Sequence, residues 1–73
     1  MYQPGDLVEV SHDCDIKYFR GKIAIIVEYV GQDATDHANG NYYRLHFDNG
    51  KHHIFYDKEL RLLSKANKNN EWI

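Results

Sequence analysis

The sequence predicts an all-β domain of five strands, and three observations support this prediction. Two glycine-containing runs rich in β-branched residues lie near the start, over residues 4–10 and 19–27. Farther along, residues of alternating polarity flank Asn49-Gly50, a pair that favours a tight hairpin turn. The density of β-branched residues in the second run, with Gly21 and Gly31 on either side, disfavours a helix there.

The length and composition of the chain indicate one small globular domain. Its 73 residues are 42% hydrophobic and 27% charged, with a net charge of -2, whereas nucleic-acid-binding proteins usually carry a basic excess. The longest apolar run, over residues 23–27, is too short to span a membrane. No basic-then-apolar signal segment opens the chain, and Cys14 is its only cysteine, so we expect a cytoplasmic protein without disulfides.

The first strand is predicted over residues 6–11, where Val8 and Val10 alternate with Glu9 as in a half-buried strand. Residues 12–20 have no clean period and form a predicted loop. The second strand, over residues 22–30, is apolar on both parities, which indicates a strand that is buried on both sides or bends between two sheets.

A polar segment with two glycines, residues 31–41, is predicted to be an exposed and mobile loop. The hairpin of residues 42–48 and 51–56 follows, with Asn49-Gly50 as a two-residue type I′ turn. This register pairs Arg44 with Phe55 and His46 with His53. It places these residues on the core face: Tyr43, Leu45, Phe47, His52, Ile54 and Tyr56.

One turn of 3-10 helix is predicted at residues 57–59, followed by a last strand over 60–63. From Ser64 onward the sequence is polar and rich in Asn and Lys until Trp72 and Ile73. We therefore expect a folded domain over residues 1–63 and a flexible polar tail over 64–73.

The order of these elements over residues 5–63 resembles a five-stranded SH3-like barrel, with its short 3-10 turn before the last strand. The segment Gly5-Asp6-x-Val8-x-Val10, followed by residues 21–26 (GKIAII), resembles the KOW pattern of ribosomal and transcription-elongation domains. In that pattern a second glycine usually stands where this chain has Ala24. The overall composition also resembles that of small bacterial or phage proteins.

The outer face of the predicted hairpin is the leading candidate binding site. It carries aromatic and cationic side chains where a solvated face would show a mixture of Lys, Glu and Thr. These residues are Tyr42, Arg44, His46, His53 and Phe55. In the alternative interpretation, Arg44 and Phe55 form a cation–π pair that stabilises only the fold.

Three other chemistries have weaker signals. His46 opposite His53 resembles half of a zinc site but lacks a third ligand, so no metal or cofactor is expected. Cys14 lies between His12 and Asp15, yet neighbours in one loop rarely provide the geometry of a nucleophile and its base. No phosphate-binding glycine loop is present, and a filled barrel this small leaves no substrate pocket, so we expect no enzyme.

The sequence therefore favours a non-enzymatic binding module that docks on another protein or assembly, as a monomer or a weak homodimer, without membrane contact. The alternative is RNA or DNA binding, as the KOW resemblance implies. In that case Tyr42, His46, His53 and Phe55 would stack on bases, and the phosphates would be bound by Arg44, Lys51, Lys22 and Arg20. A metal-dependent or thiol enzyme is the third and least favoured hypothesis.

Overall fold

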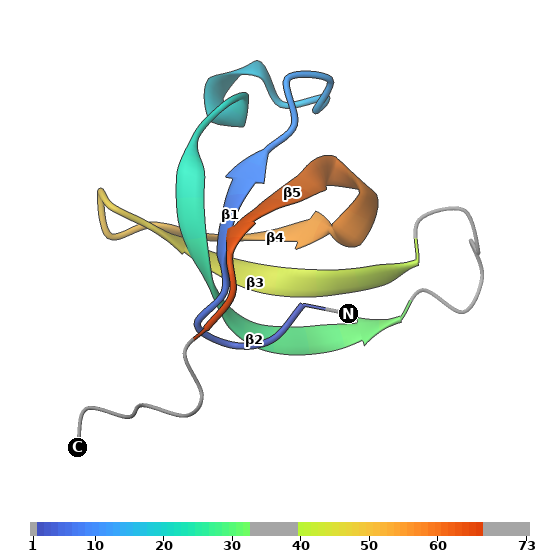
Figure 1. Cartoon of the computed structure of the whole chain (residues 1–73). Helices are drawn as coiled ribbons and strands as arrows, with labels where there is room; N and C mark the ends of the chain where they lie inside the picture. Colours follow the sequence, from blue (N-terminus) through green and yellow to red (C-terminus); the bar gives the residue numbers. More distant parts are fainter. Residues whose placement is uncertain (1, 33–39, 67–73) are drawn as a thin grey trace.

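The computed structural model describes residues 2–32 and 40–66, and within these ranges the chain is all-β (Figure 1). Five antiparallel strands form one sheet: β1 (Leu7–Val10), β2 (Ile23–Gln32), β3 (Asn41–Phe47), β4 (His52–Tyr56) and β5 (Leu60–Ser64). Two single 3-10 turns join them, η1 (Lys17–Phe19) and η2 (Asp57–Glu59). The predicted all-β fold with five strands is confirmed, as is the 3-10 turn before the last strand.

The spatial order of the strands is β4-β3-β2-β1-β5, so β2 lies at the centre. The first residues of β2 pair with β1, and β3 runs along most of its length. Register shifts interrupt the pairing with β3 between Ile26 and Glu28 and again between Tyr29 and Gly31. Such bulges bend a strand and increase its twist, and Figure 1 shows β2 curving through the whole molecule.

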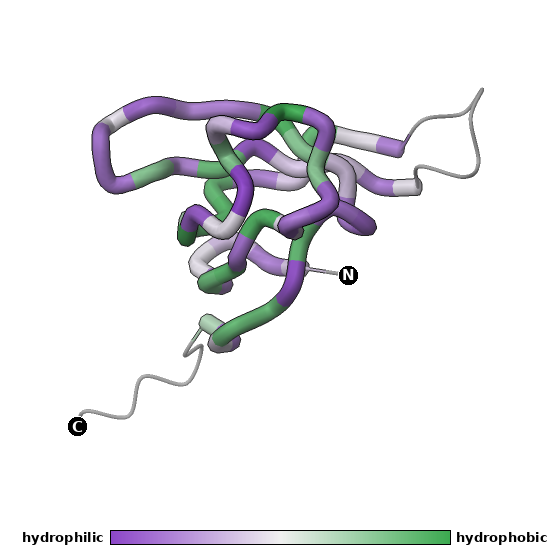
Figure 2. The backbone as a smooth tube through the Cα atoms, turned by 90° about the horizontal axis from the view of Figure 1, so that it is seen from above, coloured by the Kyte–Doolittle hydropathy of each residue, from purple (hydrophilic) through white to green (hydrophobic). Residues whose placement is uncertain are grey.

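The core lies on the inner face of this bent sheet. Its largest fully buried side chains are Tyr43, Phe47, Phe55, Ile26, Leu45, Val8 and Val10. The predicted alternation of β1 is confirmed, because Val8 and Val10 are buried while Glu9 points to the other face. Phe19 of η1 covers one end of the core, with its ring centroid 4.9 Å from that of Phe47. Figure 2 shows hydropathy changing from residue to residue within the strands and a hydrophilic β3–β4 turn.

The predicted register of the β3–β4 hairpin is wrong by one residue. Tyr43 pairs with Phe55, Arg44 with Ile54, and His46 with His52. The Phe47 N–H donates to the Lys51 carbonyl at 2.9 Å, which leaves a three-residue loop at 48–50. Gly50 adopts a φ of +84°, as expected for the last residue of such a loop.

This shift turns every side chain of β4 to the opposite face. Phe55, predicted to point outward, is buried with 2% of its surface exposed, whereas Ile54, predicted in the core, is 44% exposed. His53 pairs with Leu45 and stacks on Phe19, so it lies at the rim of the core side. The five residues of the predicted binding face therefore do not share one face.

Asp6 connects the two ends of the described chain. This carboxylate is only 3% exposed, and it accepts hydrogen bonds from the backbone N–H groups of Gln3 and Ala66 at 2.9 and 2.7 Å. Strand β5 extends to Ser64, one residue beyond the predicted end of the last strand. The rest of the predicted tail, residues 67–73, and most of the predicted mobile loop, residues 33–39, lie outside the described residues.

No helix among the described residues has the length and apolar character needed to cross a membrane.

Candidate binding surface

The outer face of the sheet carries a row of side chains that crosses all five strands. Each neighbour in the row is a paired position in adjacent strands, which places the side chains next to one another on one face. From one edge of the sheet to the other, the row is His52, His46, Ile25, Leu7 and Ser64. Ile25, at its centre, is 44% exposed.

Two ion pairs flank this row, one on each side. Arg44 donates to Glu28 through Nε at 2.7 Å and also through Nη2, and these residues pair across β3 and β2. Arg61 donates to Glu9 in the same manner, through Nε at 3.1 Å and through Nη2, across β5 and β1. Both arginine charges are therefore compensated within the sheet.

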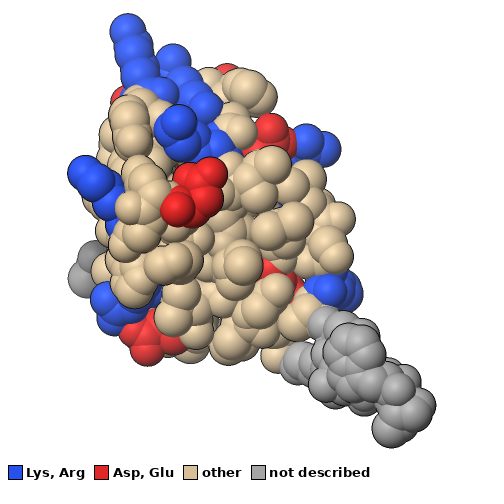
Figure 3. Space-filling view, turned by 90° about the vertical axis from the view of Figure 1, so that its left-hand side faces the viewer, with Lys and Arg blue, Asp and Glu red and all other residues tan. Residues whose placement is uncertain are grey.

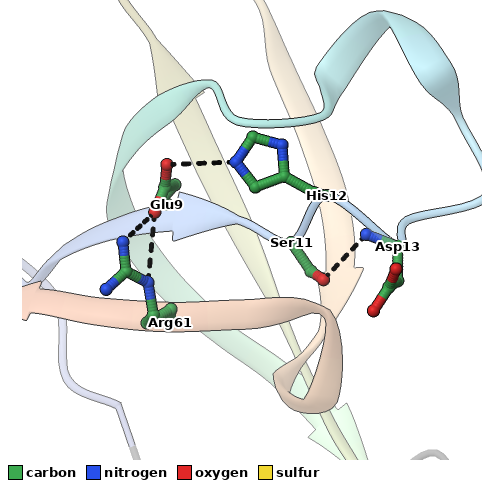
Figure 4. Close-up of polar contacts among 5 residues, drawn as sticks. All are labelled: Glu9, Ser11, His12, Asp13 and Arg61. Carbon is green, nitrogen blue, oxygen red and sulfur yellow. Dashed lines mark hydrogen bonds and ion pairs between the residues drawn. The ribbon is translucent and has the colours of Figure 1, made fainter.

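The environment of Glu9 makes its ionised form favourable. Figure 4 shows the carboxylate between the Arg61 guanidinium and the His12 ring, whose Nε2 lies 3.8 Å away. The hydrogen bond from Arg61 is the main cause that holds the pKa of Glu9 below its usual range. In the same view the Asp13 N–H donates to the Ser11 hydroxyl at 3.0 Å, which fixes the start of the following loop.

Large aliphatic side chains fill the spaces between these charged groups. Ile23 precedes Ile25 on the same face of β2 and is 51% exposed, and Ile54 is 44% exposed beside Arg44. Val27, at the first bulge of β2, is 41% exposed. A scattered surface isoleucine is ordinary, but neighbouring exposed aliphatic residues on one face are typical of a contact surface.

We define the outer sheet face by Leu7, Ile23, Ile25, Arg44, His46, His52 and Ile54. Of the predicted binding residues, Arg44 and His46 lie on this face. Tyr42 lies at its margin, half-buried, with its ring 5.3 Å from that of Tyr56. Phe55 lies in the core and His53 at its rim, so these two residues are separated from Tyr42, Arg44 and His46.

Sequence reasoning missed Ile23 and Ile25 as surface residues. The apolar residues on both parities of β2 indicated a strand that is buried on both sides or bends between two sheets, but only Ala24 and Ile26 are buried, at 3% and 1% exposure. The second apolar parity would have needed another element to cover it, and no α-helix is present in residues 2–32 and 40–66 to do so.

His46 and His52 form a hydrogen-bonded pair within the outer sheet face. Nε2 of His52 lies 2.8 Å from Nδ1 of His46, and the ring planes meet at 73°. Both side chains are exposed. The predicted pairing of His46 with His53 is thus replaced by a closer pairing with His52.

A second surface lies at the end of the molecule that carries η1. Tyr18 is 57% exposed, its hydroxyl accepts from the Asn49 side chain at 3.3 Å, and Lys22 Nζ lies 4.9 Å from its ring centroid. Figure 3 shows basic side chains gathered at this upper end of one side of the molecule. Farther down that side the basic groups are separate, and acidic side chains lie among them, so the face drawn has no continuous basic stripe.

Cys14 lies in the interior with 2% of its surface exposed. Burial is the main cause that raises the pKa of its thiol, and Sγ lies 3.8 Å from the Glu59 carboxylate, which also disfavours a thiolate. This environment is opposite to the electropositive, accessible one that activates a nucleophilic cysteine. Across residues 2–32 and 40–66, no group of three or more His, Cys, Asp or Glu side chains is placed to hold a metal ion.

Comparisons of the chain with protein-family models, with curated proteins and with solved structures found no match.

Proposed function

We propose that the protein is a small, non-enzymatic cytoplasmic module with an SH3-like barrel of the KOW type, which docks on another protein through the outer sheet face. The strand order, the long bent β2 and the 3-10 turn before β5 support the barrel assignment. The buried, unpaired Cys14 suits a reducing compartment.

One observation carries the functional part of this proposal. Ile23, Ile25 and Ile54 are each 44–51% exposed on a single face of the sheet. Burying such aliphatic surface contributes roughly 25 cal/mol per Å², which favours association with a protein surface of matching shape. The two flanking Arg–Glu pairs would form the polar rim that surrounds the apolar centre of many interfaces.

The outer sheet face can be tested with one matched pair of substitutions. Ile25→Glu places a carboxylate at the centre of the face, and Ile16→Glu makes the same change on the loop before η1, at a similar exposure of 42% against 44%. The immobilised native chain and both variants are incubated with lysate of the source organism, and a captured protein is then titrated against each chain.

We expect Ile25→Glu to weaken binding by at least about tenfold, the factor that corresponds to 1.4 kcal/mol, and Ile16→Glu to leave it unchanged. Circular dichroism of the three chains serves as the folding control. The proposal fails if the native chain captures nothing that Ile25→Glu does not, or if the two substitutions weaken binding equally. Sedimentation at increasing concentration separately tests whether the captured partner is a second copy of the chain.

A second candidate function, RNA or DNA binding, is favoured by the surface at η1. An exposed aromatic ring beside lysine is the combination that stacks on a base and neutralises a phosphate. Tyr18 and Lys22 provide it, and Lys17 and Arg20 are exposed nearby in sequence. This candidate predicts affinity for mixed single-stranded RNA or DNA that falls steeply as salt increases. Tyr18→Ala should abolish it, and absence of retention at low salt would refute it.

A further inference from the structure

We propose that His46 and His52 form a two-imidazole site for a late first-row divalent metal ion, and that Cu²⁺ is the ion this site binds most tightly. This inference is independent of the proposed docking function. It rests on the pairing of the two residues across β3 and β4, which places both rings on the outer sheet face with their nitrogens in direct contact.

The distance between the two nitrogens matches the spacing of adjacent ligands on a metal. Metal–imidazole bonds are about 2.0–2.1 Å long, so two nitrogens at a right angle on the metal lie about 2.8–3.0 Å apart, and at a tetrahedral angle about 3.3–3.4 Å apart. Nε2 of His52 and Nδ1 of His46 are separated by 2.8 Å. The two nitrogens therefore lie within a few tenths of an ångström of the spacing of adjacent ligands on one metal ion, and among late first-row divalent ions Cu²⁺ binds a given set of nitrogen ligands most tightly.

Metal binding breaks the hydrogen bond between the two rings, and each neutral ring keeps its one N–H hydrogen. In the neutral pair, one of the two facing nitrogens carries a hydrogen and the other accepts it. When that hydrogen moves to the second nitrogen of its own ring, both facing nitrogens present a lone pair to the metal. Rotation of the rings about their side-chain bonds directs the two lone pairs toward one point.

The surroundings of the pair do not oppose a cation. The position paired with His46 in β2 is Ile25, and the next residue of β3 on the same face is Arg44, whose charge is compensated by Glu28.

β-Sheet geometry also keeps the two ligands in place before the metal arrives. Both histidines lie within regular strands, and their backbone positions are fixed by the β3–β4 pairing. Two imidazoles held in this manner lose less freedom on binding than two histidines on a flexible loop, which strengthens the chelate.

The test is a titration of the full chain with Cu²⁺ at neutral pH, monitored by isothermal calorimetry. An electron paramagnetic resonance spectrum is then recorded at one equivalent of metal. The variants are His46→Gln and His52→Gln, with His53→Gln as the matched control. His53 is also an exposed histidine of β4, but its ring stacks on Phe19 instead of facing the pair. All three substitutions lie at exposed positions, so folding is preserved, and circular dichroism verifies it.

For the native chain and His53→Gln, we expect the same tight Cu²⁺ site with two nitrogen ligands in its spectrum. His46→Gln and His52→Gln should each weaken that site at least about tenfold and remove one nitrogen from the spectrum. Zn²⁺ should bind more weakly than Cu²⁺ at the same site. The proposal is overturned if either substitution of the pair changes the dissociation constant less than twofold, or if His53→Gln weakens binding as much as they do.

Discussion

The burial of Phe55 leads to the sharpest prediction about stability. Phe55 is 2% exposed, and its ring centroid lies 5.3 Å from that of Phe19 and 6.1 Å from that of Phe47. Deleting a buried phenylalanine side chain typically costs about 3–5 kcal/mol. At about 0.05–0.15 kcal/mol per residue, a chain of 73 residues has roughly 4–11 kcal/mol of stability in total. Phe55→Ala should therefore remove a large share of the stability, and at the lower end of that range it would leave the protein unfolded.

A milder substitution keeps the comparison measurable. Phe55→Leu retains an apolar side chain but loses the aromatic contacts, so we expect a cost of about 1–2 kcal/mol. Ile54→Ala, at the neighbouring position with 44% exposure, should cost less than about 1 kcal/mol. The measurement is urea denaturation followed by far-ultraviolet circular dichroism, in which 1 kcal/mol shifts the midpoint of a domain this small by about 1 M.

The hairpin register that the sequence predicts would give the opposite order, because it places Ile54 in the core and Phe55 outside. If Ile54→Ala lowers the midpoint as much as Phe55→Leu, the register described above is wrong, and the outer sheet face must be redefined.

Three further predictions follow from particular residues. Gly50→Ala should destabilise the protein by about 1 kcal/mol because φ at Gly50 is +84°, whereas Gly31→Ala, with open space at its Cβ, should be nearly neutral; thermal denaturation of both variants measures this. Cys14, which is buried and has a raised thiol pKa, should react with iodoacetamide at pH 8 at least about tenfold slower in the native protein than in urea, and equal rates would contradict its burial. The pKa of Glu9 is lowered by Arg61 below the usual 4.5, so its stabilising contribution is complete above that value and is lost as the pH falls through the folded-state pKa. The stability difference between the native chain and Glu9→Gln should therefore be present at pH 7 and disappear in acid, and a difference independent of pH would refute this.

The strand content could be predicted from the sequence because local pattern and tertiary packing agree over most of the chain. Val8 and Val10 alternate with Glu9, and Tyr43, Leu45 and Phe47 alternate along β3, so one parity of each strand is clearly apolar. For such strands, burial of the apolar parity determines which face turns inward, and the structure agrees at every one of these positions.

The register of β4 could not be predicted in this way, because His52, Ile54 and Tyr56 on one parity are nearly as apolar as His53 and Phe55 on the other. Only the turn remained to decide between them, and Asn49-Gly50 is compatible with both a two-residue and a three-residue loop. The structure uses the longer loop, in which the Lys51 N–H donates to the Asn49 side chain at 2.9 Å. Phe55 can then fill the core between Phe19 and Phe47, a contact that depends on the position of η1.

The candidate surface was predicted only in part for the same reason. Arg44 and His46 lie on β3, whose faces were assigned correctly, and both are on the outer sheet face. The two partners assigned from β4, His53 and Phe55, exchanged faces with His52 and Ile54 when the register shifted.

The pairing of β1 with β5 also determines how the fold resists a pulling force. Leu7, at the start of β1, lies opposite Ser64, at the end of β5, so the chain enters β1 and leaves β5 on the same side of the sheet. A force applied through those ends would first load the bonds of Tyr2 to Tyr43 and Leu60 and the bonds of Asp6. It would then break the hydrogen bonds between β1 and β5 one after another. Domains whose terminal strands are pulled apart from one end unfold at low force, because only one hydrogen bond between the two strands bears the force at a time. In a chain under tension, this unit would extend before neighbours whose terminal strands are sheared lengthwise.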